Sequence, residues 1–231
     1  MDLQQEKDAR PRTKQLFVYQ TLRDAIMHCT LQPGERLVTE TIAHQLNVSL
    51  IPVREALQLL RAEGLVESSA HVGARVAAIT RESVVETFTL MEGLELVAAR
   101  TAAERLSHAD DLSLQRIVQQ MDDCERDAQF EDWGNLNSEF HLKIAQITAM
   151  PLLYDMTTRV FGQWDRIRRY FFKDVLALRI HTSQEEHHAL LAALQQGDTV
   201  QLARLVQIHN QAALAAYLAY LPSTNTAEPI L

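Results

Sequence analysis

The most informative part of the chain is residues 48–57, which read VSLIPVREAL. Ser49 suits the N-cap of a helix because its hydroxyl can accept a backbone N–H, and Pro52 then falls in the first turn, where its missing N–H costs nothing. The apolar residues that follow at helical spacing and predict one buried face are Val53, Ala56, Leu57 and Leu60. We therefore expect a helix that begins at Ser49 and ends at Gly64.

Shorter patterns on both sides of this helix complete a small domain. Helices are expected at residues 14–29 and 39–46, with Thr39 capping the second, and two short strands are expected at 65–68 and 74–78. Three short helices followed by a hairpin are the layout of a winged helix-turn-helix. In that fold one helix lies in the major groove of duplex DNA.

The rest of the chain is typical of an all-α helical bundle. The expected helices cover residues 83–105, 109–128, 133–148, 152–172, 184–196 and 199–220. Ser183 and Glu186 resemble a capping box at the start of the fifth of these helices. Gly197 ends that helix, and Asp198 caps the last one.

Charge is divided unevenly along the 231 residues, which carry a net charge of −8. Residues 1–79 hold equal numbers of basic and acidic side chains, so the whole acidic excess lies in residues 80–231. This asymmetry indicates two domains with different functions, in a fold that is mainly α. The expected organisation is a flexible arm at 1–13, a winged helix-turn-helix at 14–79, an all-helical domain at 80–221 and a disordered tail at 222–231.

Several classes of protein are disfavoured by composition. The two cysteines, Cys29 and Cys124, cannot build a disulfide framework, and they are typical of reduced thiols in the cytoplasm. Residues 1–12 lack the apolar core of a signal peptide, and the longest apolar run, residues 212–221, is too short to span a bilayer. We therefore expect a cytoplasmic protein that does not act on a membrane.

Four strings together resemble the GntR family of bacterial transcription regulators. They are PGERL at 33–37, VSLIPVREAL at 48–57, EGLV at 63–66 and Gly73. The helical half resembles the ligand-binding domain, called FCD, of the FadR subfamily, so the resemblance covers about residues 14–220. It implies a homodimer that binds a pseudo-palindromic operator in double-stranded DNA. It also implies that a small-molecule effector, an organic or sugar acid, controls this binding.

The resemblance also implies which residues contact DNA. They are Arg36, Thr39, Ser49, Leu50, Ile51, Pro52, Arg54, His71 and Gly73. Arg54 matches the second Arg of the family string, whereas Leu50 and Ile51 replace its first Arg and its Thr. Contact with thymine methyl groups is one explanation of this replacement. Packing against the wing, or a loss of DNA affinity, is the alternative. Since Glu40 also replaces a common Arg, we expect few phosphate contacts and a weak salt dependence.

Two histidines of the helical half are expected to meet. His187 lies ten residues before Gly197, and His209 lies eleven after Asp198, so an antiparallel hairpin places both at the same height. Each lies on an apolar helix face and should point inward. Asn137 and His141 share one face of another helix, at a spacing of four residues.

These residues match the metal-binding pattern of some FCD domains, Asp-x-x-x-His followed by two further histidines. His141, His187 and His209 fit that pattern, while Asn137 stands in place of the Asp. The resemblance therefore implies a divalent transition metal, zinc first, with nickel or manganese as alternatives. Buried hydrogen-bonded histidines, or direct contacts to an effector, are the other interpretations. Asn137 is a poor ligand, so we expect either a lower metal affinity or the loss of the fourth protein ligand.

Effector contacts are expected at Met91, Glu95 and Arg168. Met91 stands where many FCD domains have an Arg, one turn before Glu95. Arg168 is the best replacement in the sequence, because a guanidinium can hold an organic acid through two parallel hydrogen bonds. The alternative is a structural salt bridge between Arg168 and Glu95.

Two other functions compete with a DNA-binding regulator. Three histidines could support a metal-dependent hydrolase, but no Glu is placed as a general base, so we do not expect an enzyme. A winged-helix protein that has lost its DNA affinity could act through protein contacts instead.

Overall fold

The computed structural model describes residues 14–69, 73–171, 175 and 177–221. Contacts divide the chain into two compact units between Ala78 and Ile79, and each unit is described by itself. In the described part of the chain, no helix combines the length and the apolar character needed to cross a membrane.

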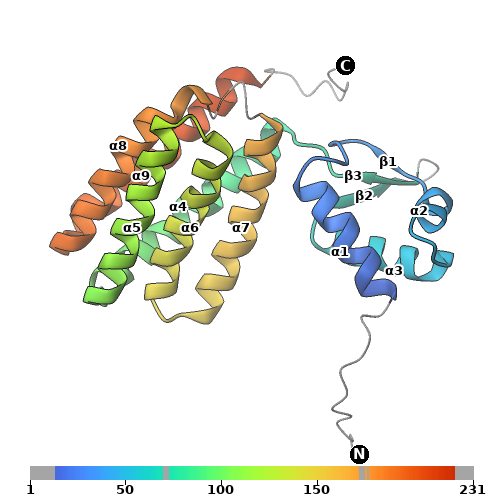
Figure 1. Ribbon diagram of the computed structural model, residues 1–231, viewed down its shortest axis with the longest axis horizontal. Helices are drawn as coiled ribbons and strands as arrows, with labels where there is room; N and C mark the ends of the chain where they lie inside the picture. Colours follow the sequence, from blue (N-terminus) through green and yellow to red (C-terminus); the bar gives the residue numbers. More distant parts are fainter. Residues whose placement is uncertain (1–13, 70–72, 172–174, 176, 222–231) are drawn as a thin grey trace, which may run out of the picture. The chain divides into compact units, whose positions relative to one another are not determined.

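The first unit is a winged helix-turn-helix (Figure 1). Its elements are α1 (Lys14–Met27), β1 (Arg36–Leu37), α2 (Thr39–Gln45), α3 (Leu50–Ala62), β2 (Val66–Ser69) and β3 (Gly73–Val76). The strands form an antiparallel sheet in the order β1-β3-β2, in which Val66 lies opposite Val76 and Arg36 opposite Arg75. The two-residue strand β1 is too short to show a hydrophobic period and was not predicted.

The predicted buried face of α3 is confirmed. Val53, Ala56 and Leu60 are fully buried in the core of the first unit. Gly64 ends the helix with a φ of 72°, because its N–H donates to the Arg61 carbonyl while the Leu65 N–H donates to the Leu60 carbonyl. The third helix is therefore fixed in the unit by one apolar face, and its other face is free of the core.

One predicted N-cap, Thr39, is wrong, and another, Ser49, has the right position but lacks the expected hydrogen bond. Val38 is the N-cap of α2, so Thr39 is already the first helical residue and its side chain caps nothing. Ser49 does occupy the N-cap of α3, but its hydroxyl accepts no capping hydrogen bond. The first turn of α3 is thus left with backbone N–H groups that a bound partner can use.

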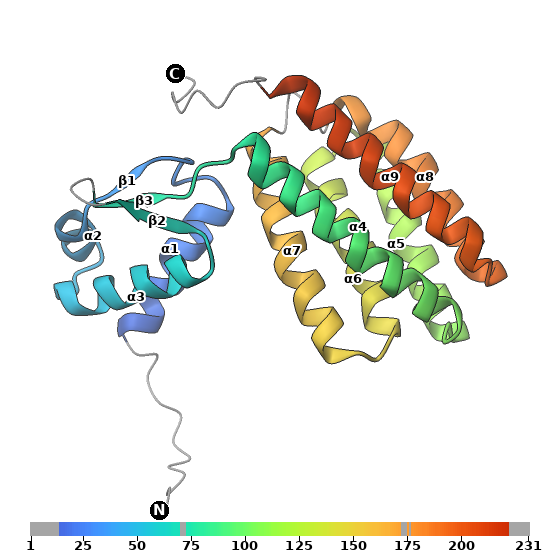
Figure 2. The ribbon, with the colours of Figure 1, turned by 180° about the vertical axis from the view of Figure 1, so that it is seen from behind.

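The second unit is the predicted all-α bundle (Figure 2). Its helices are α4 (Arg81–Ala103), α5 (His108–Arg126), α6 (Phe130–Ile147), α7 (Pro151–Tyr170), α8 (Ala177–Gln196) and α9 (Thr199–Tyr220). The long helix α4 packs against α6, α7 and α9, and α8 packs against α5 and α9. Gly197, with a φ of 67°, and Asp198, which accepts from the Gln201 N–H at 2.9 Å, make the expected turn between α8 and α9.

Helix α8 begins at Ala177, seven residues before the predicted start. Ser183 therefore lies inside the helix, and the predicted capping box of Ser183 and Glu186 is wrong. Both side chains instead contact Arg179, which donates to the Ser183 hydroxyl at 2.5 Å and pairs with Glu186 at 3.0 Å. The longer helix puts Arg179, Ser183 and His187 on one face at spacings of four residues.

Candidate functional site

The exposed end of α3 carries the predicted DNA-contacting side chains of that helix. Ile51 is 66% exposed and Leu50 is 38% exposed, and Arg54 is also exposed one turn later. Together with Ser49 at the N-cap, they form a surface on which a cation and two apolar side chains flank the start of a helix. Helix N-termini bind phosphate groups, and a side chain at this end can reach base edges.

The other predicted DNA-contacting residues are placed differently. Arg36 is exposed on β1, Thr39 is half-buried at the start of α2, and Gly73 begins β3 with a φ of 87°. Pro52 is buried, because its ring belongs to the inward face of α3, so the prediction that it contacts DNA is corrected. His71 lies outside the described residues.

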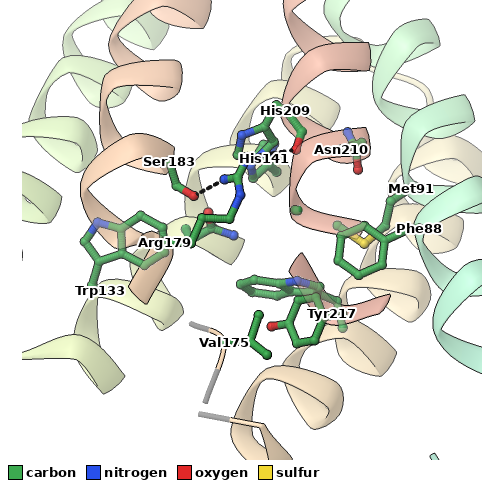
Figure 3. A pocket seen from close by; sticks show the side chains of 13 residues that line it. Phe88, Met91, Trp133, His141, Val175, Arg179, Ser183, His209, Asn210 and Tyr217 are labelled. Carbon is green, nitrogen blue, oxygen red and sulfur yellow. Dashed lines mark hydrogen bonds between the residues drawn. The ribbon is translucent and has the colours of Figure 1, made fainter. Parts of the chain in front are cut away.

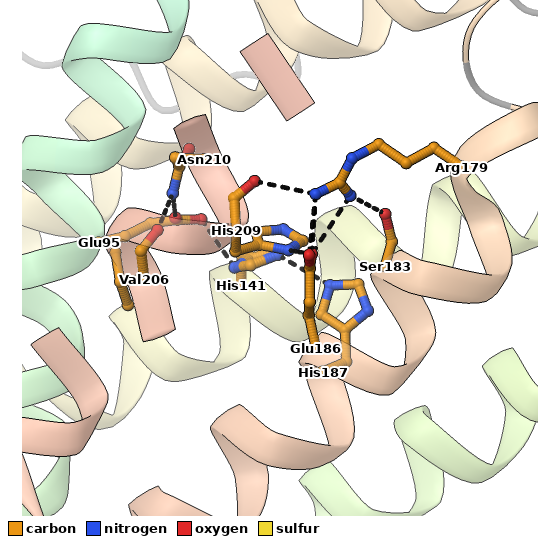
Figure 4. Close-up of polar contacts among 9 residues, drawn as sticks. All are labelled: Glu95, His141, Arg179, Ser183, Glu186, His187, Val206, His209 and Asn210. Atoms are coloured by element: carbon orange, nitrogen blue, oxygen red, sulfur yellow. Dashed lines mark hydrogen bonds and ion pairs between the residues drawn. The ribbon is translucent and has the colours of Figure 1, made fainter. Parts of the chain in front are cut away.

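Three buried histidines meet inside the helical bundle (Figure 4). His141 comes from α6, His187 from α8 and His209 from α9, and each offers a ring nitrogen within 4.8 Å of the other two. The Nε2 atoms of His141 and His187 are 3.3 Å apart. The hairpin spacing therefore predicted correctly which histidines come together.

Two carboxylates, the buried Glu95 and the half-buried Glu186, contact the outer nitrogens of this cluster. Glu95 Oε1, from α4, lies 2.7 Å from His141 Nδ1, and Glu186 Oε2, from α8, lies 2.6 Å from His209 Nδ1. A carboxylate on Nδ1 selects the tautomer with its proton there and leaves the Nε2 lone pair facing the cluster. Glu95 thus supports His141, and it is not among the residues that line the adjoining cavity.

The surroundings of His187 and His209 favour the neutral form of both imidazoles. Burial lowers the pKa of His187 well below its ordinary value, and the charges of His209 and His141 lower it further. Burial also lowers the pKa of His209, although the hydrogen bond with Glu186 opposes this effect. Burial raises the pKa of Glu95, but His141, His209 and Asn210 outweigh it and leave that pKa below its ordinary value. Neutral imidazoles beside an ionised carboxylate are the state that binds a metal ion.

The spacing of two of the three nitrogens matches that of ligands on one divalent metal. Two imidazole ligands of a tetrahedral zinc ion, each at 2.0–2.1 Å, lie about 3.3 Å apart, which is the separation of the His141 and His187 nitrogens. Asn137, one turn before His141, is 3% exposed and lines the adjoining cavity. His187 differs from its two partners, because its Nδ1 has no hydrogen-bond partner within the described residues.

A cavity adjoins the histidine cluster (Figure 3). Its empty space is about 440 Å³, part of which is continuous with solvent. Its walls come from α4, α6, α7, α8, α9 and Val175, and the lining residues are Phe88, Met91, Trp133, Asn137, His141, Trp164, Val175, Arg179, Ser183, His209, Asn210, Ala213 and Tyr217. Because mostly apolar walls and a few polar groups converge on this cavity, it is a candidate small-molecule site.

Arg179 is the cation of this cavity that sequence reasoning missed. Its guanidinium pairs with Glu186 at 3.0 and 3.2 Å and donates to the His209 carbonyl at 3.3 Å. Burial lowers its pKa, although the charge of Glu186 opposes this effect. The spacing of four residues to Ser183 and His187 could have revealed it, but the expected helix began after Ser183.

Arg168 has a different environment from the one predicted. It is fully buried, lies 2.7 Å from Asp165 and 3.4 Å from Glu131, and is not among the residues that line the cavity. Its guanidinium covers Gly134 so closely that a Cβ there would lie 2.5 Å from Nη1. The contacts of Arg168 therefore join α6 to α7, and the alternative of a salt bridge to Glu95 is replaced by these two carboxylates.

Two family models match the chain. Residues 14–76 match the model of bacterial regulatory proteins of the gntR family, and residues 86–212 match the model of the FCD domain. The matches fall on the winged helix-turn-helix and on the helical bundle with its histidine cluster.

Individual proteins and solved structures are similar over most of the chain. The HTH-type transcriptional regulator McbR of Escherichia coli K12 is 28% identical over 79% of this chain and 83% of its own. The HTH-type transcriptional repressor RspR of the same organism is 28% identical over 84% of each chain. The structure of E. coli McbR/YncC has a TM-score of 0.73 and 26% identity and covers 90% of this chain and 99% of its own. A GntR regulator structure from Rhodococcus sp. RHA1 has the same TM-score at 22% identity, covers 91% of this chain and all of its own, and supports the fold alone.

Proposed function

Because the chain belongs to the GntR family of bacterial regulatory proteins and carries an FCD domain, we propose that α3 binds operator DNA under the control of a metal-centred effector site. Membership of this family identifies the chain as a DNA-binding transcription regulator with an effector-binding domain. It also argues against an enzyme. The observation that supports the metal-centred site is the histidine cluster with its two carboxylates.

Contacts to DNA are proposed for the exposed end of α3. The guanidinium of Arg54 contacts bases or phosphates, and the exposed side chains of Leu50 and Ile51 contact thymine methyl groups. Because Leu50 replaces a charged residue of the family string, this surface makes few phosphate contacts. Binding is accordingly less sensitive to salt than in a regulator with a basic helix.

The proposed metal is zinc, held by His141, His187 and His209. Three clustered imidazole nitrogens, two of them 3.3 Å apart, favour zinc over nickel or manganese, which favour other geometries and ligand sets. The amide oxygen of Asn137 is neutral and binds more weakly than a carboxylate would. When bound, a divalent metal supplies a Lewis-acid centre with an open position for the carboxylate of an organic acid.

A second copy of the chain is the proposed partner in solution. A homodimer fits a pseudo-palindromic operator, because two α3 helices then reach two half-sites. Exposed large apolar side chains on α4 and α7 offer surface for such a contact. They are Val85, Leu90, Val97, Leu152, Tyr154 and Met156. Light scattering of the full chain measures its mass directly and would reject the dimer if it found monomers alone.

Neighbouring histidines provide a matched test of the metal site. His187 belongs to the buried cluster, whereas the side chain of His188 is 52% exposed and contacts Asp122. Elemental analysis should find stoichiometric zinc in the wild-type chain and in His188→Ala, and strongly reduced zinc in His187→Ala. Equal metal content in all three proteins would reject the site.

Selection from random duplexes tests the DNA-binding surface. The wild-type chain should enrich a two-fold symmetric sequence, and Arg54→Ala should weaken binding to it while the fold is retained. Failure of the wild-type chain to enrich any sequence at low salt would reject the proposed function.

A further inference from the structure

We propose that the effector is a monocarboxylate with an apolar body and a hydrogen-bond acceptor at the end opposite its carboxylate, which accepts from the Tyr217 hydroxyl. This inference rests on the proposed metal-centred site, since the carboxylate is placed there. It names the chemical class of the ligand and the residue that selects it.

The register of α8 and α9 gives the cavity two distinct ends. The helices run antiparallel from Gly197, and residues of the two helices at equal distances from that turn form successive layers about 6 Å apart. The layers are His187 with His209, then Ser183 with Ala213, then Arg179 with Tyr217. All of these residues except His187 line the cavity, so the cavity extends from the histidine cluster toward Tyr217.

The end at the histidine cluster is polar and carries the guanidinium of Arg179. Although Arg179 begins in the far layer, its guanidinium reaches back to Glu186 and to the His209 carbonyl. Asn210 follows His209 directly, and Asn137 lies one turn before His141. A ligand carboxylate therefore finds its charge partners at this end, beside the metal position.

Tyr217 offers one unused donor at the opposite end. The residue is 3% exposed and lines the cavity, and its hydroxyl has no hydrogen-bond partner within the described residues. Figure 3 shows His141 and His209 at one end of the cavity and Tyr217 near Val175 at the other. Burial raises the pKa of Tyr217, so the group remains a protonated donor. A buried hydroxyl left unpaired is unfavourable, and a ligand acceptor removes that cost.

The walls between the two ends are apolar. They are formed by Phe88, Met91, Trp133, Trp164 and Ala213. A sugar acid would place several hydroxyls against these side chains without partners, which is costly. A flat or branched apolar body has no hydroxyls to leave unpaired against these walls, so the cavity favours an aromatic or branched acid over a sugar acid.

Two benzoates that differ at one position test the role of Tyr217. The para oxygen of 4-methoxybenzoate can accept a hydrogen bond, whereas 4-ethylbenzoate has about the same size without an acceptor. Calorimetry on the zinc-loaded full chain should show roughly three- to tenfold tighter binding of 4-methoxybenzoate, the ratio expected for one net hydrogen bond. D-gluconate should bind more weakly than either compound.

Two variants complete the experiment. Tyr217→Phe should bind both benzoates equally, whereas Tyr170→Phe, which removes a hydroxyl from the end of α7 outside the cavity lining, should keep the wild-type preference. Tighter binding of gluconate than of the benzoates, or an unchanged preference in Tyr217→Phe, would overturn the inference. Zinc content measured on the same samples separates this failure from a failure of the metal site.

Discussion

At the scale of single residues, Leu50 gives the DNA-binding surface its individual character. Its side chain is 38% exposed beside Ile51 at the start of α3, where the family string has a charged and a polar residue. An exposed apolar side chain can contact the methyl group of thymine but cannot hydrogen-bond to guanine. The base preference of this regulator should therefore differ from that of relatives with the family string.

The substitution Leu50→Arg tests this reading of the helix. Arginine donates two hydrogen bonds to guanine, so the preferred base pair opposite position 50 should change from one with thymine to one with guanine. The discrimination gained should be about 1–3 kcal/mol, measured by selection from random duplexes. An unchanged preference would refute the methyl contact.

Glu186 and Glu185 are adjacent in α8 but have different surroundings. Glu186 contacts His209 Nδ1 at 2.6 Å, whereas Glu185 is 69% exposed and contacts only the exposed His181, at 3.6 Å, among the described residues. Glu186→Gln should lower zinc affinity roughly ten- to hundredfold, because a carboxylate behind an imidazole ligand orients it and increases its basicity. Glu185→Gln should leave affinity unchanged. Competition with a zinc chelator measures both, and equal affinities in the two variants would contradict the role of Glu186.

Acid should destabilise the metal-free protein through the same cluster. The folded-state pKa of His187 is well below its ordinary value near 6.5, so the unfolded chain binds more protons between these two values. The contribution of the neutral His187 imidazole to the free energy of unfolding is complete above about pH 6.5. It is lost as pH falls toward the folded-state pKa, by about 1.4 kcal/mol for each pH unit.

A variant without that imidazole isolates the effect. Urea unfolding in the presence of a chelator should show the wild-type free energy of unfolding falling between about pH 7.5 and 5.5. In His187→Leu the fall should be smaller by about 1.4 kcal/mol. Parallel pH dependences in the two proteins would count against the low pKa.

At the scale of secondary-structure elements, local signals located most helices but misplaced the start of α8. Ser183 and Glu186 have the spacing of a cap, which is a local preference. Contacts outside that short segment extend the helix further toward the N-terminus. Ile180 is buried in the core, and Arg179 donates hydrogen bonds to both Ser183 and Glu186. As a result, Arg179 falls outside the helices predicted from the sequence, and its place at the cavity could not be inferred.

Gly64, just after the end of α3, and Gly93, inside α4, offer a matched pair of substitutions. An added Cβ meets no atom within 4 Å at either position, but Gly64 has a φ of 72° and Gly93 is exposed inside α4. Gly64→Ala should destabilise the protein by about 1 kcal/mol, because a left-handed backbone is unfavourable for alanine. Gly93→Ala should stabilise it by about 0.5–1 kcal/mol. Calorimetry of the full chain checks both signs, and stabilisation by Gly64→Ala would contradict the end assigned to α3.

At the scale of the whole molecule, the sequence was sufficient for the architecture and for the histidine cluster. The rise of a helix is constant, so equal distances from the turn at Gly197 brought His187 and His209 together. The same reasoning could not tell which arginine, Arg168 or Arg179, lies at the cavity. That choice depends on Asp165, Glu131 and the space above Gly134, which no spacing within one helix reveals.

Control of DNA binding by the helical bundle is the central claim about the molecule. Such control requires a coupling free energy between the two sites, which is commonly worth five- to 150-fold in affinity. The coupling must disappear when the metal site is removed, even if DNA binding itself remains. His187→Ala therefore serves as the control for any effect of zinc on DNA affinity.

The most direct measurement is the affinity of the full chain for its selected duplex, by fluorescence anisotropy, with zinc and after chelation. The wild-type chain should prefer the selected duplex over a scrambled one, and its affinity should change at least fivefold or so on removal of zinc. His187→Ala should show one affinity under both conditions. Equal binding of selected and scrambled duplexes, or a wild-type affinity that does not respond to zinc, would contradict this account.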